Sequence, residues 1–307
     1  MDSAESFFDW VDRVISKEED RVKEIVNMVK RGERLLNCDY LPTRYNLDGQ
    51  MERDEWPNFQ LDGYGTWLWA LSQHIEVTGK VELIHKYKRS IKVTIEYLIC
   101  LWKTPNYDCW EENGDRIHPA TLACIFGGLN SISKYLEDIE VINTAANIKQ
   151  FVLDNCVENG HLVKYIGYDC VDSSLIWVSV PFGMLNPEDE VMKKTILEIE
   201  SKLVHNYGVH RYLKDTYYGG GEWLLLSGYL GWYYTEIREI RKAQSFLDWI
   251  EKQADENGNM TEQVLYHVND PDYIAKWQNL WGETAKPLLW SHAIYLILKQ
   301  KIAHKYY

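Results

Sequence analysis

Long apolar runs are missing from this sequence. No stretch approaches the roughly 20 apolar residues that a transmembrane helix needs. The chain opens with Asp2 and Glu5 instead of the basic and then apolar residues of a secretory signal. We therefore expect a protein that does not bind a membrane and that is located in the cytoplasm.

Metal-binding and disulfide patterns are missing too. The cysteines are scattered without a CxxC pair or a Cys/His ligand spacing, and His118, His267 and His292 lack the spacing of a metal set. The sequence thus predicts no metal site and no disulfide framework, and we expect reduced, mostly buried thiols. The six cysteines are Cys38, Cys100, Cys109, Cys124, Cys156 and Cys170.

Positive charge is scarce. The chain has 33 Lys and Arg against 46 Asp and Glu, a net charge of -13 at pH 7. Because proteins that bind a phosphate backbone normally present a basic face, we expect no nucleic-acid partner.

Strand patterns and linkers are scarce as well. Residues 161–165 and 263–268 are short strand candidates, and no low-complexity tract or Pro/Gly/Ser linker divides the chain. An apolar fraction of 46% suffices for a sizeable core. We expect a nearly all-helical protein that forms one domain over residues 1–307.

Helical periodicity is what the sequence has instead. Apolar residues recur at i, i+3, i+4 and i+7, with Gly79 after one segment and Asp172 and Asn186 before two others as boundary signals. The predicted helices cover residues 7–15, 22–29, 64–78, 83–99, 119–135, 138–154, 175–180, 187–203, 222–234, 236–254 and 288–303.

The helices follow one another in pairs, with a repeat of roughly 50 residues that is typical of an open solenoid or a closed α/α toroid. Polar and aromatic clusters occupy the loops that enter the first helix of a pair. In a ring of antiparallel helices these loops would emerge at one end and converge on one cavity, which favours the toroid. The clusters are residues 56–62, 107–114, 168–172, 211–223 and 260–263.

Tryptophan and tyrosine are unusually frequent: there are 13 Trp and 21 Tyr but only 7 Phe. Both side chains combine a flat apolar face with a polar group, which suits a wet, aromatic-lined pocket. Trp56, Trp110, Trp223 and Trp290 are candidates for stacking on sugar C–H faces. Core packing is the alternative for each of them, and the favoured one for Trp290, which lies in an apolar helix.

Two adjacent carboxylates, Glu111 and Glu112, follow Trp110 in a loop between helices. An acid that protonates a leaving glycosidic oxygen must stay protonated near neutral pH. Burial beside Trp110, with the negative charge of Glu112 or Asp108, would raise the pKa of Glu111 accordingly. Glu111 is the candidate general acid. Taken alone, the motif would be a solvated acidic loop.

Glu262 is the candidate general base, and a separation of about 6.5–9.5 Å from the acid would leave room for an attacking water and give inversion. Upstream, Arg211 and Asp215 offer a forked donor and an acceptor for sugar hydroxyls. The glycine run at 219–221 lets backbone approach a ligand. A phosphate-binding loop is the weaker alternative, because no Lys-Ser/Thr pair follows.

These segments together resemble glycoside hydrolase family 15, the glucoamylase-like enzymes. Trp-Pro-Asn-Phe-Gln-Leu-Asp-Gly, starting at Trp56, is similar to the family's Trp…Gln-x-Asp-Gly segment, and Asp-Cys-Trp-Glu-Glu, starting at Asp108, to the loop that carries its catalytic acid. The segment from Arg211 resembles its substrate-binding segment, and Glu262 its base. Pro-Leu-Leu-Trp-Ser-His-Ala, from Pro287, resembles a helix of prokaryotic and archaeal members.

The resemblance implies an (α/α)6 barrel that removes glucose from the non-reducing ends of α-glucans or α-gluco-oligosaccharides, with inversion and without a cofactor. Glu111 would act as the acid and Glu262 as the base. The implied substrate-binding residues are Trp56, Asp62, Trp110, Glu112, Arg211, Asp215, Trp223 and Trp290.

One family motif is absent: residues 1–55 hold no Trp-x-Arg-Asp, whose Arg and Asp grip the terminal glucose in the family. We therefore expect a barrel that begins one or two helices late and is completed by a second chain, or a remodelled or weakly active site. Two alternative functions stay open: a non-catalytic carbohydrate-binding or regulatory protein, and a trehalase-type specificity on the same scaffold.

Overall fold

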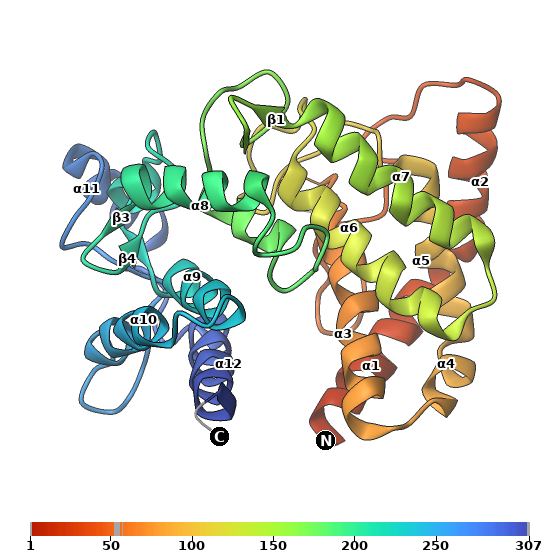
Figure 1. Cartoon of the computed structure of the whole chain (residues 1–307). Helices are drawn as coiled ribbons and strands as arrows, with labels where there is room; N and C mark the ends of the chain where they lie inside the picture. The colour runs from red at the N-terminus through yellow and green to blue at the C-terminus, as the bar shows by residue number, and fades with distance from the viewer. Residues whose placement is uncertain (1, 52–55, 57, 306–307) are drawn as a thin grey trace. The chain divides into compact units, whose positions relative to one another are not determined.

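The structure is a computed structural model that describes residues 2–51, 56 and 58–305 (Figure 1). Pro57, part of the segment that begins at Trp56, lies outside the described residues. Contacts divide the chain into two compact units: unit 1 is Met1–Cys156 with Tyr165–Gly167, and unit 2 is Val157–Lys164 with Tyr168–Tyr307. The single domain over residues 1–307 stays a prediction, and each unit is described by itself.

The described residues of unit 1 form α-helices and two short 3-10 helices. They are α1 (Asp2–Ile15), η1 (Ser16–Glu18), α2 (Glu19–Lys30), α3 (Asp62–Thr78), α4 (Glu82–Lys86), α5 (Lys88–Leu101), α6 (Pro119–Ile132), η2 (Ser133–Tyr135) and α7 (Ile139–Asn155).

Helix α6 is the centre of the unit 1 core. It packs against α3 and against α7 (Figure 1). Its sequence, PATLACIFGGLNSI, is apolar or small on every side, and nearly all of its residues are buried, as expected of a helix surrounded by others. Gly65 of α3 and Gly128 of α6 bring the two backbones together, because a Cβ on either glycine would collide with a carbonyl oxygen of the other helix.

Unit 2 combines helices with three two-stranded antiparallel ribbons, which pair β1 with β2, β3 with β4 and β5 with β6. Its elements are β1 (Val157–Glu158), β2 (His161–Leu162), η3 (Ser173–Val178), α8 (Glu190–Leu203), β3 (Val204–His205), β4 (Gly208–Val209), η4 (Tyr217–Gly219), β5 (Glu222–Trp223), α9 (Leu224–Glu236), α10 (Ile240–Lys252), β6 (Gln263–Val264), η5 (Pro271–Tyr273), α11 (Ile274–Trp281) and α12 (Leu289–Lys305).

Helix α9 has the same role in unit 2 as α6 in unit 1. Its sequence, LLLSGYLGWYYTE, is almost entirely buried, and the helix packs against α10 and α12 (Figure 1). The β1–β2 hairpin turns through Asn159 and Gly160, both with positive φ, which is the backbone that a two-residue hairpin loop requires.

Most predicted helices are confirmed, and so are the boundary signals Gly79 and Asp172. The start predicted at Asn186 is wrong, because α8 begins at Glu190. Gly79 ends α3 in the left-handed conformation, and the side chain of Asp138 caps α7. Asp172 also caps a helix, η3, which is a 3-10 helix.

Two other predictions about the elements are wrong. The helix over residues 83–99 is two helices, because the backbone leaves the helical region at Tyr87. Glu222 and Trp223 do not start α9, because they pair with residues 263–264 as strand β5. Both short strand candidates are confirmed as pieces of small ribbons, with two residues each in β2 and β6. Helix α11 and the β3–β4 hairpin were not predicted.

Two further expectations concern the cysteines and the membrane. Among the cysteines only Cys124 and Cys156 are buried, Cys38 is exposed and the other three are half-buried, so the prediction of mostly buried thiols is wrong. Within residues 2–51, 56 and 58–305, no helix has the length and hydropathy required to cross a membrane.

The glycine contact between α3 and α6 yields a first prediction. Gly128→Ala should lower the free energy of unfolding by about 1–3 kcal/mol, because the new methyl group forces the two backbones apart. Gly63→Ala is the matched control: its Cβ would meet nothing within 4 Å, and alanine favours a helix by about 1 kcal/mol over glycine. Urea denaturation measures both variants, and equal stability of the two would contradict the prediction.

Candidate active site

The loop that carries Glu111 is organised by the carboxylate of Asp108. One oxygen, Oδ1, accepts hydrogen bonds from the backbone N–H of Trp110 (3.0 Å) and of Glu112 (2.9 Å), and the Asp108 N–H donates to the Glu112 carbonyl (3.0 Å). Asp108 is buried, and its other oxygen lies 3.9 Å from Nδ1 of His118. His118 in turn contacts the carbonyl of Asn113 through Nε2 (3.0 Å). The same histidine thus lies close to both Asp108 and Asn113, the residues on either side of the Trp110–Glu112 turn.

Glu111 stands at the tip of this loop in an uncommon backbone conformation. Its φ is 61°, a left-handed value that few residues other than glycine adopt. Trp110 is buried beside it, whereas Glu111 is exposed. The expected burial of Glu111 beside Trp110 is therefore wrong for unit 1 described by itself.

The segment of residues 58–62 joins the same loop. The Tyr107 N–H donates to the Phe59 carbonyl (2.9 Å), and Oδ1 of Asn106 accepts from the Leu61 N–H (3.3 Å). Two of the five predicted clusters, residues 56–62 and 107–114, thus lie together in unit 1. Trp56 is half-buried, and the guanidinium of Arg44 lies 4.3 Å from the centre of its ring.

Asp62 begins α3 within this part of unit 1. Burial raises the pKa of its carboxyl to about 6, and the negative charge of Asp108 adds to the effect. The carboxyl can therefore change its charge near neutral pH, which makes it a titratable member of the candidate site.

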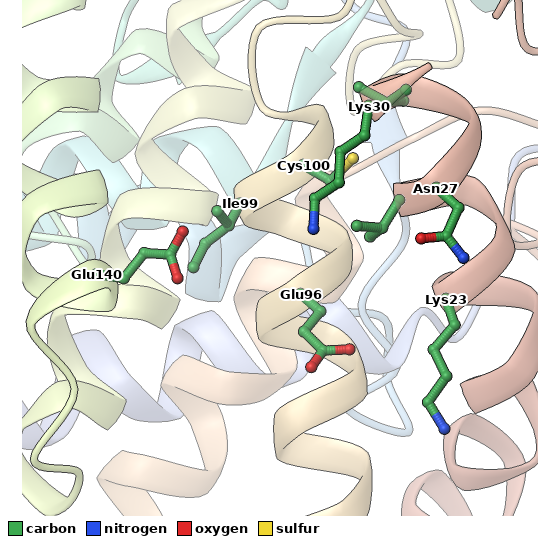
Figure 2. Close-up of a pocket in the computed structure, with 9 residues that line it drawn as sticks. Lys23, Asn27, Lys30, Glu96, Ile99, Cys100 and Glu140 are labelled. Carbon is green, nitrogen blue, oxygen red and sulfur yellow. The ribbon is translucent and has the colours of Figure 1, made fainter. Parts of the chain in front are cut away.

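A groove of about 660 Å³ elsewhere in unit 1 has a different chemistry. Lys23 and Lys30 of α2 face Glu96 and Cys100 of α5, with Glu140 of α7 at one side (Figure 2). Among the described residues that line it there is no aromatic side chain and none of the predicted site residues. The groove therefore lacks the stacking surface that sugar binding typically uses.

In unit 2, Arg211 and Asp215 form a buried ion pair. Arg211 Nε donates to Asp215 Oδ2 (2.7 Å), and the second guanidinium contact is to Oδ1. Three aromatic rings surround the guanidinium: those of Tyr217 (5.1 Å), Trp223 (5.4 Å) and Tyr212 (5.6 Å). A cation held between aromatic faces with a bidentate carboxylate is fixed in orientation.

The β5–β6 ribbon connects this cluster to Glu262. Trp223 of β5 pairs with Gln263 of β6, and the Gly221 N–H donates to the Gln263 side chain (3.0 Å). Glu262 directly precedes β6 and is half-buried. Burial and the charge of Glu262 raise the pKa of Tyr218, so the carboxylate of Glu262 lies within electrostatic reach of that tyrosine.

The first residues of α12 form hydrogen bonds with the backbone of residues 260–261, which precede Glu262. Ser291 Oγ donates to the Thr261 carbonyl (2.8 Å), and Nε2 of His292 accepts from the Met260 N–H (3.1 Å). His292 is thus a hydrogen-bonding group that links α12 to Met260. Trp290 is 42% exposed and contacts Trp177 of η3, with ring centres 6.1 Å apart.

Three predicted clusters therefore lie together in unit 2. Ser173, next to Asp172, donates through its N–H to the Arg211 carbonyl (2.8 Å), and the β5–β6 ribbon brings residues 260–263 to Trp223. In the described part of the chain, no three His, Cys, Asp or Glu side chains are placed to hold a metal ion. The catalytic and substrate-binding candidates thus form two groups, one in each unit.

Sequence reasoning missed two carboxylates. From the sequence, Asp108 is expected to contribute only a neighbouring charge, although its position two residues before Trp110 and four before Glu112 is the spacing at which an Asp side chain accepts backbone N–H groups. Glu222 was taken as a helix residue. It is 2% exposed, and within the described part of the chain its Oε1 has no hydrogen-bond partner; Nδ1 of His205 lies 3.5 Å away.

Glu222 yields a prediction of pH-dependent stability. Burial raises the pKa of its carboxyl to about 7, from 4.5. The folded state therefore binds more protons than the unfolded state between these values, and stability falls as the pH rises through them, by up to about 3 kcal/mol. Urea denaturation at pH 4.5 and pH 8 measures the free energy of unfolding. The wild type should be less stable at pH 8 than at pH 4.5 by this amount, and Glu222→Gln should lack this difference. Parallel pH profiles of the two proteins would contradict the assignment.

The sequence matches Glycosyl hydrolases family 15 over residues 2–245. It is 39% identical over 306 residues to Isomaltose glucohydrolase of Kribbella flavida, covering 98% of this chain and 79% of that protein. A more distant relative is Trehalase 2 of Sulfolobus acidocaldarius, 23% identical over 216 residues, which cover 67% of this chain and 37% of the trehalase.

The structure is also similar to solved structures. A wild-type glycosidase structure matches with a TM-score of 0.92 at 39% identity, over 97% of this chain and 81% of that one. A structure of a glutamate-to-alanine glycosidase variant in complex with glucose matches with a TM-score of 0.92 at 38% identity, over the same shares. The predicted all-α fold of the (α/α)6 toroid type is confirmed by these likenesses. The chain belongs to glycosyl hydrolases family 15 and is a glycoside hydrolase.

Proposed function

We propose that this protein is an inverting, exo-acting α-glucosidase that releases glucose from the non-reducing ends of α-gluco-oligosaccharides, with isomaltose as the leading substrate. The observation that carries the proposal is the loop of Glu111. An exposed carboxylate sits on a left-handed backbone that Asp108 holds in place, and such uncommon conformations concentrate at functional sites.

The chemistry requires one acid and one base. Glu111 donates its proton to the glycosidic oxygen as the bond to C1 of the glucose breaks, so that the leaving sugar departs as an alcohol. Glu262 takes a proton from a water that attacks C1 from the opposite face, which yields glucose of inverted configuration. The variant in the glucose-bound relative is itself a glutamate substitution, which supports glutamates as the catalytic groups.

Binding of the terminal glucose falls to the polar and aromatic groups around the two carboxylates. Arg211 and Asp215 bind vicinal hydroxyls, and Trp223 beside them offers a ring to the sugar. The further substrate-binding candidates are Trp56, Asp62, Trp110, Glu112 and Trp290.

The proposed preference for an α-1,6 linkage is supported by the isomaltose glucohydrolase, a relative with 39% identity. The trehalase relatives, at 23% and 25% identity over smaller parts of the chain, do not favour a trehalase-type specificity. This chain lacks the Trp-x-Arg-Asp motif, whose Arg and Asp bind the terminal glucose in the family. A second chain that supplies it stays a proposal.

The first test of the proposal is substitution of the two carboxylates. Glu111→Gln and Glu262→Gln should each lower kcat for isomaltose by about 10³-fold or more, because each removes a proton-transfer group, and both should leave the far-ultraviolet circular dichroism unchanged. Matched controls are Asp115→Asn, an exposed acid near Glu111, and Glu256→Gln, an exposed acid near Glu262. Calorimetric binding of glucose without any glucose release by the wild type would instead support a non-catalytic carbohydrate-binding protein.

The second test is the configuration of the product. Proton NMR during hydrolysis of isomaltose should show β-glucose first, followed by mutarotation, because a water attacks from the face opposite the leaving group. Initial release of α-glucose would mean retention and would rule out Glu262 as a base that activates water. Parallel assays of glucose release from maltose and trehalose show which glycosidic linkage is hydrolysed fastest.

A further inference from the structure

A second buried ion pair lies next to Arg211 in unit 2. Lys164, two residues after β2, is 5% exposed, and its Nζ lies 2.7 Å from Oδ2 of Asp172, which is 1% exposed. A lysine is seldom buried this deeply unless it is paired. This pair takes no part in the reaction proposed above, so its position requires another explanation.

Both oxygens of Asp172 have defined partners. While Oδ2 binds Lys164, Oδ1 accepts hydrogen bonds from the N–H (2.8 Å) and the hydroxyl (2.7 Å) of Ser174, at the start of η3. Burial alone would raise the pKa of Asp172, but the charge of Lys164 and these hydrogen bonds lower it. The carboxylate is therefore ionised, and the pair adds no net charge beside Arg211.

The ammonium group of Lys164 lies over the ring of Tyr212, with Nζ 3.6 Å from the ring centre. The guanidinium of Arg211 lies 5.6 Å from the centre of the same ring. The face of an aromatic ring attracts cations, and the attraction increases when the groups are removed from water. The Tyr212 ring is thus held by the ammonium group of Lys164 and also contacts the guanidinium of Arg211.

The backbone of residues 210–211 is held by Ser173, the neighbour of Asp172. Ser173, next to Asp172, donates through its N–H to the Arg211 carbonyl (2.8 Å) and through its hydroxyl to the His210 carbonyl (2.6 Å). Residues 172–174 therefore fix the main chain of Arg211, whereas Lys164 fixes the ring beside its side chain.

We infer that Lys164 is a positioning residue for sugar binding: through its pair with Asp172 and the ring of Tyr212 it holds the Arg211 guanidinium in the orientation that binds the hydroxyls of glucose. The inference rests on the proposed function, in which Arg211 and Asp215 contact the sugar. Nε and one terminal nitrogen of the guanidinium already bind Asp215. The remaining N–H groups therefore reach a sugar hydroxyl only when the guanidinium plane is correctly oriented, and small displacements of such a group weaken binding strongly.

Two variants test the inference without leaving a buried charge unpaired. Lys164→Met combined with Asp172→Asn removes both charges together, and the asparagine can still accept from Ser174. Tyr212→Leu removes the ring and leaves the ion pair intact, so it remains informative if the double variant does not fold. Tyr212→Phe keeps the ring and is the matched control.

The measurement is calorimetric titration with glucose, together with KM and kcat for isomaltose. The double variant and Tyr212→Leu should each raise the Kd of glucose and the KM by about tenfold, with a much smaller change in kcat, whereas Tyr212→Phe stays close to the wild type. A lower melting temperature with an unchanged Kd would show a merely structural role and overturn the inference.

Arg211→Lys separates this inference from the proposed function. The variant keeps the charge and loses the fork, so it should weaken glucose binding. If it does, while Tyr212→Leu and the double variant bind glucose as the wild type does, the role of Lys164 is refuted and the proposed function stands. If Arg211→Lys also binds glucose normally, the assignment of Arg211 as a sugar ligand fails, and the inference about Lys164 fails with it.

Discussion

The two hydrogen bonds from the amides of Trp110 and Glu112 to the Asp108 carboxylate determine the backbone on which Glu111 stands. Hydrogen bonds to an ionised acceptor are stronger than those between neutral groups, and Asp108 is buried. The left-handed conformation of Glu111 is maintained by this arrangement, because a residue other than glycine rarely adopts it without support.

The second group of candidate residues depends on charges that are buried in pairs. Arg211 with Asp215 and Lys164 with Asp172 are all at most 5% exposed, and removing an ion from water costs several kcal/mol unless a partner and hydrogen bonds offset it. Replacement of both pairs by apolar residues would be compatible with stability. Their presence beside Tyr212 is better explained by the need for donors and acceptors in fixed positions.

Sequence reasoning predicted the helices and most of the site from local signals. Gly79 marked a helix end because glycine readily adopts the left-handed backbone that ends a helix, and Asp172 marked a helix start because its side chain accepts a hydrogen bond from the first turn. It failed where a distant partner decides the outcome: Glu222 and Trp223 are extended because they pair with residues 263–264. No local sequence pattern predicts a pairing between such distant segments. The same limit hid the contact between Lys164 and Tyr212, which are 48 positions apart.

The proposed mechanism assigns Glu111 as the acid and Glu262 as the base for one glycosidic bond. A crystal structure of the Glu111→Gln variant with bound isomaltose measures this directly. We expect the side chains of residues 111 and 262 to flank the glycosidic oxygen, with their carboxamide and carboxylate carbons about 6.5–9.5 Å apart. A sugar bound with only one of the two residues near its C1 atom would contradict it.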